Sequence, residues 1–395
     1  MKVLIVAQWV KIPGFEGAAA HHMEFAKALT EAGVEVHIIA DSTEKSIGGA
    51  KVHPVNTKFP RPLLSYNTIW KIVEICKKEG IDVIHKRMDP GSGFSTFAAK
   101  KAGVPLVAEI NFNPFSFERR GGILTDAVKP AVQYYPRILW AKFFLSRADA
   151  ICCVSEVTKK ALERHGIKKN FYVIPNGVDV KRFGMSSKRA VEKLKKSLDI
   201  TGPVIEIVGG LGPRHGLDSI VYSATRIEKE FPEARFVIVG GIEKYIDYIE
   251  RIKSKAPSNV IFAGRIADKE LPLYLGMADI CLAPFHEALN PAEPYGFCPI
   301  KILEYMGAGK PIVATKLSWI EELLEHGKNA ILFSTPEEMV EGIETLLLDE
   351  NLRLRIGKEN RKKAEEKYSW QHIAKEYIKV YKSLIKKKEG MKSAS

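Results

Sequence analysis

A lysine and a glutamate three residues apart, Lys301 and Glu304, stand just after a glycine-bearing loop in residues 293–315, EPYGFCPIKILEYMGAGKPIVAT. Pro299 suits the first position of a helix, because its ring fixes φ and its missing N–H would be unpaired there anyway. Helical spacing then places Lys301 and Glu304 on one face. The ammonium group can neutralise an anion, and the carboxylate can accept hydrogen bonds from hydroxyl groups.

The loop before this predicted helix can supply further donors. Gly296 and Phe297 precede the helix start, so their N–H groups can converge with those of the first turn, where the helix dipole favours negative charge. Gly307 and Gly309 are expected to end the helix, and Ile312 to begin a buried strand. The stretch therefore predicts a cradle for a diphosphate, with a plain packing element of an α/β protein as the alternative.

The elements that must hold this cradle repeat along the chain as apolar runs separated by helix-length segments. We expect strands at residues 2–7, 34–40, 83–85, 105–110, 150–154, 171–174, 204–208, 235–240, 260–263, 280–283, 312–314 and 331–333. Such alternation predicts parallel sheets with helices on both faces, which bind ligands at the carboxyl ends of their strands. A chain of 395 residues is too long for one compact core, so the predicted fold class is α/β with two domains.

Further candidates lie at the ends of predicted strands. Gly17 and Ala18 follow the first strand but lack the dinucleotide fingerprint, so a simple connecting loop is the alternative to a ligand loop. Asn111 follows another strand and offers an amide that can donate to a hydroxyl or carbonyl but cannot carry a proton. A glycine-rich turn, GGLGPRHG, leads into a helix and contains Arg214 and His215.

Composition excludes several classes of protein. A hydrophobic content of 46% with 27% charged residues indicates a globular chain. No apolar run approaches the roughly 20 residues of a membrane span, and the N-terminus enters a strand directly, so we expect a cytoplasmic protein. The five cysteines show no metal spacing and read as core thiols. Only three glutamines beside many lysines and glutamates suggest a heat-adapted source.

The net charge of +13 is concentrated in the amino-terminal half of the chain. Residues 1–183 carry 27 Lys and Arg against 17 Asp and Glu, a net charge of +10. Aromatic and basic residues also mix in the stretch 112–148, which suits peripheral contact with an anionic membrane face or a lipid-linked acceptor. A core helix with snorkelling cations is the alternative, and no motif supports nucleic-acid binding.

Two sequence motifs are similar to those of a known family. Residues 173–183, VIPNGVDVKRF, and the run from Glu304 to Thr315 resemble retaining glycosyltransferases with two Rossmann-like halves, the GT-B fold, in the nucleotide-sugar family numbered four. The resemblance implies a GT-B fold with an acceptor-side domain at 1–183 and a nucleotide-sugar-binding domain at 184–369. The segment 370–395 would then form a helix that packs back on the first domain, followed by a basic tail.

The resemblance implies transfer of a sugar from a nucleoside-diphosphate sugar to an acceptor hydroxyl of a saccharide or lipid-linked acceptor, with retention of anomeric configuration. No cofactor is implied, and no Asp-x-Asp metal signature occurs. Stabilising the leaving diphosphate is the main task, for which Lys301, Arg214 and the amides of Gly296 and Phe297 are the candidates. Glu304 would bind the ribose hydroxyls, as the family's second Glu does.

The sequence departs from the family pattern at four positions. Gly210 stands where the family has a phosphate-binding Arg, and His215 where it has a Lys. Asn111 replaces the His that faces the donor sugar, so an acid or base role there is in doubt. Gly296 replaces the first Glu, and Glu293 is the candidate substitute if the loop is remodelled.

Arg265 and Ile266 resemble the family segment whose backbone holds the nucleobase, and backbone recognition leaves the identity of the nucleotide open. Two alternatives to glycosyl transfer remain. One is a nucleotide-sugar epimerase of the same fold. The other is a protein that binds a sugar nucleotide or polyanion without turnover. Glycine at positions 210 and 296, where the family has Arg and Glu, motivates this alternative.

Overall fold

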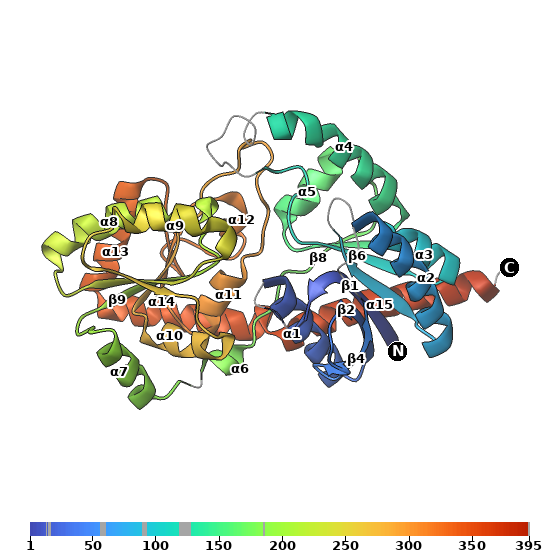
Figure 1. Cartoon of the computed structure of the whole chain (residues 1–395), viewed down its shortest axis with the longest axis horizontal. Coiled ribbons are helices and arrows are strands. Elements are labelled where there is room, and N and C mark those ends of the chain that lie inside the picture. Colours follow the sequence, from blue (N-terminus) through green and yellow to red (C-terminus); the bar gives the residue numbers. More distant parts are fainter. Residues whose placement is uncertain are drawn as a thin grey trace.

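The computed structural model describes residues 1–12, 14, 17–55, 61–88, 93–117, 128–184 and 186–393. Figure 1 shows two α/β lobes side by side, each built on its own sheet with helices on both faces. The last two long helices follow one another along the lower side of the view in Figure 1, the first beneath the second lobe and the last beneath the first lobe. No helix among the described residues is long and apolar enough to cross a membrane.

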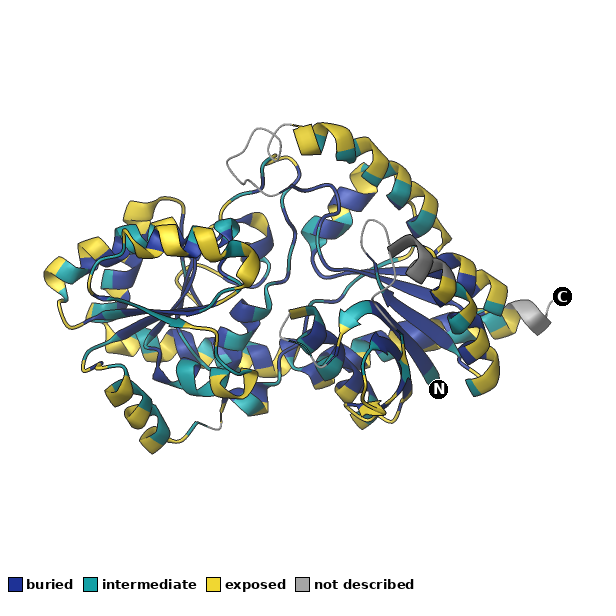
Figure 2. Cartoon of the chain, viewed as in Figure 1, coloured by how far each residue is buried: buried dark blue, intermediate teal, exposed yellow. Residues whose placement is uncertain are grey.

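The amino-terminal lobe contains an eight-stranded sheet with the strand order β3-β4-β2-β1-β5-β6-β7-β8. All neighbouring strands run parallel except β3 and β4, which are antiparallel. The strands are β1 (Lys2–Lys11), β2 (Glu35–Asp41), β3 (Ser46–Ile47), β4 (Ala50–Pro54), β5 (Val83–Arg87), β6 (Leu106–Ile110), β7 (Ala150–Cys153) and β8 (Phe171–Val173). The central strands are covered on both faces, as their nearly continuous apolar runs predict (Figure 2).

The carboxy-terminal lobe contains a six-stranded parallel sheet with the order β11-β10-β9-β12-β13-β14. Its strands are β9 (Val204–Gly209), β10 (Arg235–Gly240), β11 (Val260–Gly264), β12 (Ile280–Ala283), β13 (Ile312–Thr315) and β14 (Ile331–Phe333). The strand order reverses between β9 and β12, and such a switch point opens a crevice at the carboxyl ends of the strands. The predicted cradle residues follow β9 and β12.

Helices cover both sheets and connect the lobes. The amino-terminal lobe has α1 (Gly17–Glu31), α2 (Arg61–Glu79), α3 (Ser95–Ala102), α4 (Lys129–Phe144), η2 (Leu145–Arg147) and α5 (Glu156–Arg164). The link has α6 (Val180–Phe183) and α7 (Lys188–Ser197). The second lobe has η3 (Pro213–His215), α8 (Leu217–Glu230), η4 (Glu243–Tyr245), α9 (Ile246–Lys253), η5 (Asp268–Glu270), α10 (Leu271–Met277), α11 (Ile300–Gly307), α12 (Ser318–Glu321), α13 (Pro336–Leu348) and α14 (Glu350–Lys363).

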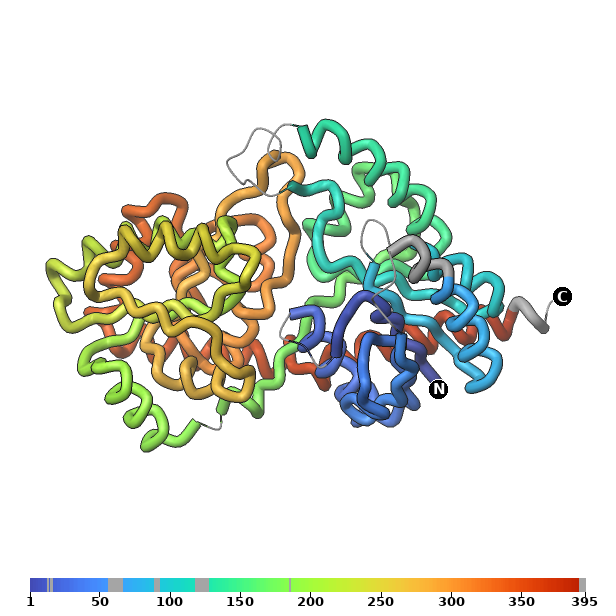
Figure 3. Tube along the Cα trace, viewed as in Figure 1, coloured from blue at the N-terminus to red at the C-terminus, as the bar shows by residue number. Residues whose placement is uncertain are grey.

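The chain returns to the first lobe through the π-helical turn η6 (Ala364–Tyr368) and the helix α15 (Trp370–Ser393), traced in red in Figure 3. The Phe25 ring on α1 lies 6.0 Å from the Trp370 ring and 4.9 Å from the Tyr377 ring. Tyr381 reaches His85 on β5. The expected GT-B architecture, with a C-terminal helix that crosses back, is therefore confirmed.

The key helix α11 begins one residue later than predicted. Pro299 has φ −68° and ψ 119°, an extended conformation that places it at the N-cap position, and its carbonyl accepts hydrogen bonds from Ile302 and Leu303. The helix ends at Gly307, and Gly309 adopts φ +66°, as the two glycines predict.

Candidate active site

Lys301 lies on α11 directly against the glycine-rich turn that follows β9. A Cβ placed on Gly209 would lie 3.1 Å from both Cε and Nζ of Lys301, and its φ of +133° is one that residues with side chains rarely adopt, so a substitution here would crowd the amine and strain the backbone. The Lys301 side chain is buried, and its Nζ has no hydrogen-bond partner among the described residues. A buried ammonium group without an acceptor is costly, which indicates a site made for an anion.

Three basic side chains gather at this point. Burial and the nearby Arg214 lower the pKa of Lys301 to about 7, although Glu304 partly opposes that shift. Burial, Lys301 and Arg214 hold the pKa of His215 well below its ordinary value, so this imidazole is neutral. His215 Nδ1 lies 3.2 Å from the carbonyl of Gly212. His215 thus shapes the turn, while Lys301 and Arg214 provide the positive charge.

Arg214 is placed by its backbone and by an aromatic wall. Its carbonyl accepts a hydrogen bond from the amide of His286 at 2.9 Å, and its guanidinium lies 4.8 Å from the Phe297 ring. The Phe297 ring in turn stacks on Tyr295 and packs edge-on against Trp319. The loop before α11 therefore holds Arg214 beside Lys301.

Gly296 explains one departure from the family pattern. It adopts φ +63°, and its carbonyl accepts hydrogen bonds from Ser155 Oγ at 2.6 Å and Thr158 Oγ1 at 2.7 Å, both at the start of α5. A Cβ at this position would lie 2.5 Å from Thr158 Oγ1, so a glutamate does not fit here. Within the described chain, the amides of Gly296 and Phe297 donate no hydrogen bond and stay available to a ligand.

Glu293 lies outside the cradle, in a polar cluster between the lobes. Its buried carboxylate accepts hydrogen bonds from Asn113 Nδ2 and His165 Nε2, each at 2.8 Å, and from Tyr134 and Arg164 at 3.3 Å. These partners lie on α4, α5 and the loop after β6. The structure thus gives Glu293 a bridging position and does not bring it to Lys301.

Glu304 lies one turn along α11 from Lys301, facing the link between the lobes. Burial raises the pKa of its carboxyl to about 7, with Arg182 as the strongest opposing charge. Arg182 itself pairs with Asp268 at 2.9 Å.

Arg265 and Ile266 follow β11, where Arg265 is exposed and Ile266 is half-buried against the core.

The amino-terminal lobe supplies the facing wall. Gly17 opens α1, and a Cβ there would lie 3.6 Å from Cδ1 of Ile300, so this loop meets the start of α11. The carbonyl of Ala18 binds His22 Nδ1 at 2.6 Å. Asn111 donates to Glu109, and the next ring, Phe112, lies 6.0 Å from Phe297. Both predicted loops of the first lobe therefore reach the cradle.

A buried polar network behind this wall escaped the sequence analysis. Glu109 lies 3.0 Å from His21 Nε2 and 2.7 Å from His85 Nε2, and His85 Nδ1 lies 2.7 Å from the hydroxyl of Tyr381. Burial opposes ionisation, but His21 and the hydrogen bonds from both histidines hold the pKa of Glu109 well below its ordinary range. The network joins α1, β5, β6 and α15, and no local sequence pattern predicts that these elements meet.

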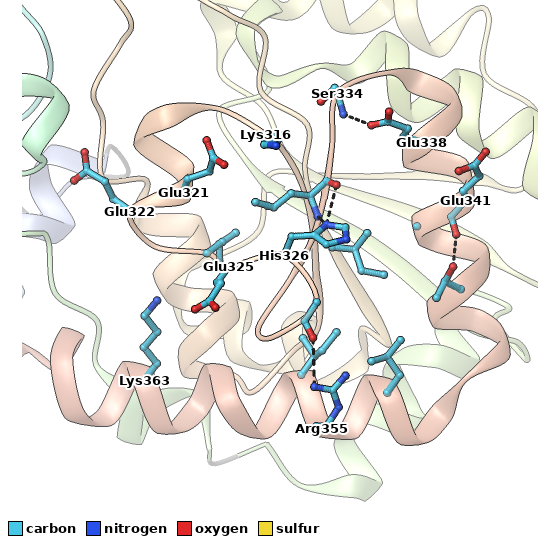
Figure 4. A pocket seen from close by; sticks show the side chains of 18 residues that line it. Lys316, Glu321, Glu322, Glu325, His326, Ser334, Glu338, Glu341, Arg355 and Lys363 are labelled. Carbon is cyan, nitrogen blue, oxygen red and sulfur yellow. Dashed lines mark hydrogen bonds between the residues drawn. The ribbon is translucent and has the colours of Figure 1, made fainter.

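A separate cavity of 1090 Å³ opens on the second lobe between α12, β14, α13 and α14 (Figure 4). Five glutamates line it beside three lysine or arginine residues, so its wall is net acidic, and none of the predicted site residues lines it. Its carboxylates oppose the binding of an anion, so the cradle remains the candidate site.

Two family models match the chain, one to each lobe. Residues 15–182 match Glycosyltransferase Family 4, and residues 202–349 match Glycosyl transferases group 1. Spore coat protein SA of Bacillus subtilis is 26% identical over 52% of this chain, but the match spans only 57% of that protein. The uncharacterized glycosyltransferase MJ1607 of Methanocaldococcus jannaschii is 27% identical over 97% of this chain and 98% of its own length.

The fold is also similar to solved structures. Anabaena Alr3699/HepE, crystallised in complex with UDP and glucose, superposes with a TM-score of 0.76. The superposition covers 97% of this chain and 100% of that one at 21% sequence identity. At this identity the likeness establishes the shared GT-B fold.

Proposed function

Because the chain belongs to family 4 of the glycosyltransferases, we propose that it transfers a sugar from a nucleoside-diphosphate sugar to an acceptor hydroxyl with retention of anomeric configuration. One observation carries this proposal. The Lys301 amine is buried, has no hydrogen-bond partner among the described residues, and lies beside Gly209 in the glycine-rich turn at the switch point of the second sheet.

The proposed chemistry breaks the bond between the anomeric carbon and the diphosphate oxygen. Negative charge grows on the diphosphate as that bond loosens, and in this proposal Lys301, Arg214 and the amides of Gly296 and Phe297 stabilise it. The acceptor adds on the same face and gives its proton to the departing phosphate. No protein nucleophile is then required, which suits an asparagine at position 111.

Glu304 is proposed to bind the ribose hydroxyls of the donor. Glu304 shares α11 with Lys301 and lies one turn away, so a nucleotide whose phosphates meet Lys301 would bring its ribose hydroxyl donors to this carboxylate. Gly264, Arg265 and Ile266 are proposed to hold the base through their backbone. With two cations and two amides at the phosphates, the proposal needs no metal ion for the transfer.

A thermal-shift screen with UDP, GDP, ADP and CMP, and with their sugar conjugates, tests the proposal. Ligand linkage predicts a stability gain of about 2.7 kcal/mol at a hundredfold excess over Kd. We expect one nucleoside diphosphate to raise the Tm and the Lys301→Ala variant to lose that shift. If no nucleotide raises the Tm, the proposed phosphate cradle is wrong. If a nucleotide raises the Tm but no acceptor receives sugar, a protein that only binds the nucleotide is favoured.

We further propose that the acceptor is linked to a lipid and reached at a membrane surface. One stripe of α4 and its N-cap exposes apolar side chains at helical spacing, namely Val128 at the cap and Val132, Tyr135, Leu139 and Phe143 in the helix. The opposite face of α4 packs on the core through Tyr134, Ile138 and Trp140. The Phe143 ring contacts Phe97 of α3, which is also exposed, so the apolar surface extends beyond one helix.

Cations border this stripe in the lobe that carries most of the net charge. Lys129 and Lys142 are exposed on α4, and the Arg147 guanidinium lies 3.7 Å from the Phe143 ring. Apolar side chains flanked by cations suit the boundary between headgroups and acyl chains of an anionic bilayer.

Replacing Tyr135 and Leu139 together by serine should lower binding to anionic phospholipid vesicles by roughly 10- to 100-fold, because two exposed apolar side chains no longer enter the bilayer. Co-sedimentation with vesicles of anionic and of neutral lipid measures this. The matched control replaces Leu348 and Leu354 of the other lobe, which are 77% and 65% exposed, and should bind as the wild type does. Equal loss in both double variants would reject α4 as the contact.

A further inference from the structure

Two histidines and a glutamate meet at the edge of the first sheet, away from the cradle. His37 lies on β2, His53 on β4, and Glu79 ends α2. His37 Nδ1 lies 3.0 Å from His53 Nε2, and one ligand atom from each of the three residues lies within 4.8 Å of the others. The two imidazole rings stack with an angle of 16°.

A fourth side chain sets the orientation of His37. The Oε1 atom of Glu35 lies 3.2 Å from His37 Nε2, so this nitrogen donates its N–H to the carboxylate. The lone pair of Nδ1 is then directed toward His53. A carboxylate behind a ligating histidine is the usual way in which proteins fix the tautomer and orientation of a metal ligand.

We propose that His37, His53 and Glu79 bind a divalent transition-metal ion such as Zn²⁺ and thereby tie α2 to β2 and β4. Tetrahedral zinc with Zn–N bonds of 2.0–2.1 Å separates two ligand nitrogens by about 3.3 Å, close to the observed spacing. Two imidazoles and a carboxylate suit zinc rather than calcium or magnesium. Water can complete the fourth position on this accessible edge.

A lysine pairs with Glu79, the third proposed ligand. Lys51 Nζ lies 2.9 Å from Oε1 of Glu79, while the Lys51 side chain is 58% exposed and free to swing into solvent. Lys2 pairs with Glu35 at 3.1 Å, and the Lys71 amine binds the carbonyl of Pro54 nearby. Lys51 therefore competes with a cation for Glu79, which gives the proposal a variant that should strengthen binding.

Zinc titration of the full chain, freed of any affinity tag and stripped of metal, tests the site by competition with a chromophoric chelator. We expect one saturable equivalent and a rise in Tm on loading. His53→Gln and Glu79→Gln should each weaken zinc binding by at least about 100-fold, and Glu35→Gln by about 10- to 100-fold. Lys51→Gln should tighten it, and His372→Gln, in α15, should leave it unchanged.

X-ray absorption of the zinc-loaded chain should show nitrogen and oxygen ligands, including imidazole, and no sulfur. The proposal is overturned if no saturable equivalent binds, or if His53→Gln and Glu79→Gln bind zinc as the wild type does. It is independent of sugar transfer, because the readouts are metal affinity, Tm and coordination.

Discussion

Replacing Lys301 by alanine is expected to lower kcat for sugar transfer by about 10²- to 10³-fold, the usual cost of removing one donor aimed at developing negative charge. The effect should be this large because, in the part of the chain that the structure describes, only the Lys301 amine lies beside Gly209, and burial leaves it unscreened by water. Nucleoside diphosphate affinity should fall as well. Steady-state kinetics with the donor found in the thermal-shift screen, together with calorimetric titration of the diphosphate, measure both effects.

The pH dependence of binding should report the same amine. With a pKa of about 7, Lys301 is protonated below pH 7 and loses its charge as the pH rises. The diphosphate requires the charged form, so its Kd should rise about tenfold per pH unit above 7, until the pKa of the complex is reached. Lys301→Arg keeps the charge at all these pH values and should flatten the profile even where its bulk weakens binding.

The control for both measurements is Lys358→Ala, which removes an exposed lysine from α14 in the same lobe. It should match the wild type in kcat and in the Kd profile. Should Lys301→Ala transfer sugar at the wild-type rate, the diphosphate is held elsewhere and the proposed cradle is wrong.

The fold was largely readable from the sequence because burial on both faces of a parallel sheet leaves uninterrupted apolar runs. Strands β10, β12 and β14 begin and end at the predicted residues. The ends of α11 followed from Pro299 and the two glycines to within one residue, since these residues act through their own backbone geometry.

The arrangement of the cradle residues could be predicted only in part from the sequence. The placement of Lys301 and Glu304 on one helix depends only on local sequence, and the structure has both residues on α11. The place of Glu293 was not local, because it depends on hydrogen bonds to Asn113 and His165, more than a hundred residues away. The need for glycine at position 296 could not be predicted either, because it arises from the contact with Thr158, which is distant in the sequence.

The metal-site candidate shows the same limit. His37 and His53 are sixteen residues apart and Glu79 lies a further helix away, so no short spacing marks them. They meet because β4 pairs with β2, with Ile39 opposite His53, and because α2 ends over that edge. Pairing of strands, rather than any motif, brings the three side chains together.

The sequence analysis did not single out Glu206, because this residue lies within an otherwise apolar strand, VIEIVG. It is fully buried in β9, and among the described residues neither of its carboxylate oxygens has a hydrogen-bond partner. Burial raises the pKa of its carboxyl from 4.5 to about 8, and the charge of Lys310 partly opposes that shift. The Lys310 amine is engaged elsewhere, by the carbonyls of Gly276 and Ala278.

This carboxyl should make the folded chain less stable as the pH rises. The unfolded chain releases the Glu206 proton near pH 4.5, whereas the folded chain keeps it until about pH 8. Between these values the folded state binds more protons, so the free energy of unfolding falls with increasing pH. The contribution of Glu206 should fall by about 3 to 4 kcal/mol between pH 5 and pH 8.

Glu206→Gln removes this titration and should gain on the wild type by that amount over the same interval, measured by urea-induced unfolding at pH 5, 6.5 and 8. The unpaired amide of the variant costs the same at every pH, so only the change in the difference is diagnostic. Glu250→Gln, at an exposed position on α9, should follow the wild type throughout.

Glu109 provides the opposite sign within the same molecule. It is equally buried in the other sheet, but two histidines hold its charge, so its contribution is present at neutral pH and is lost as the pH falls through its depressed pKa. Two glutamates of equal burial should therefore shift stability in opposite directions, because only one has partners. A difference between Glu206→Gln and wild type that stays constant with pH would mean that Glu206 is ionised and paired in the folded chain.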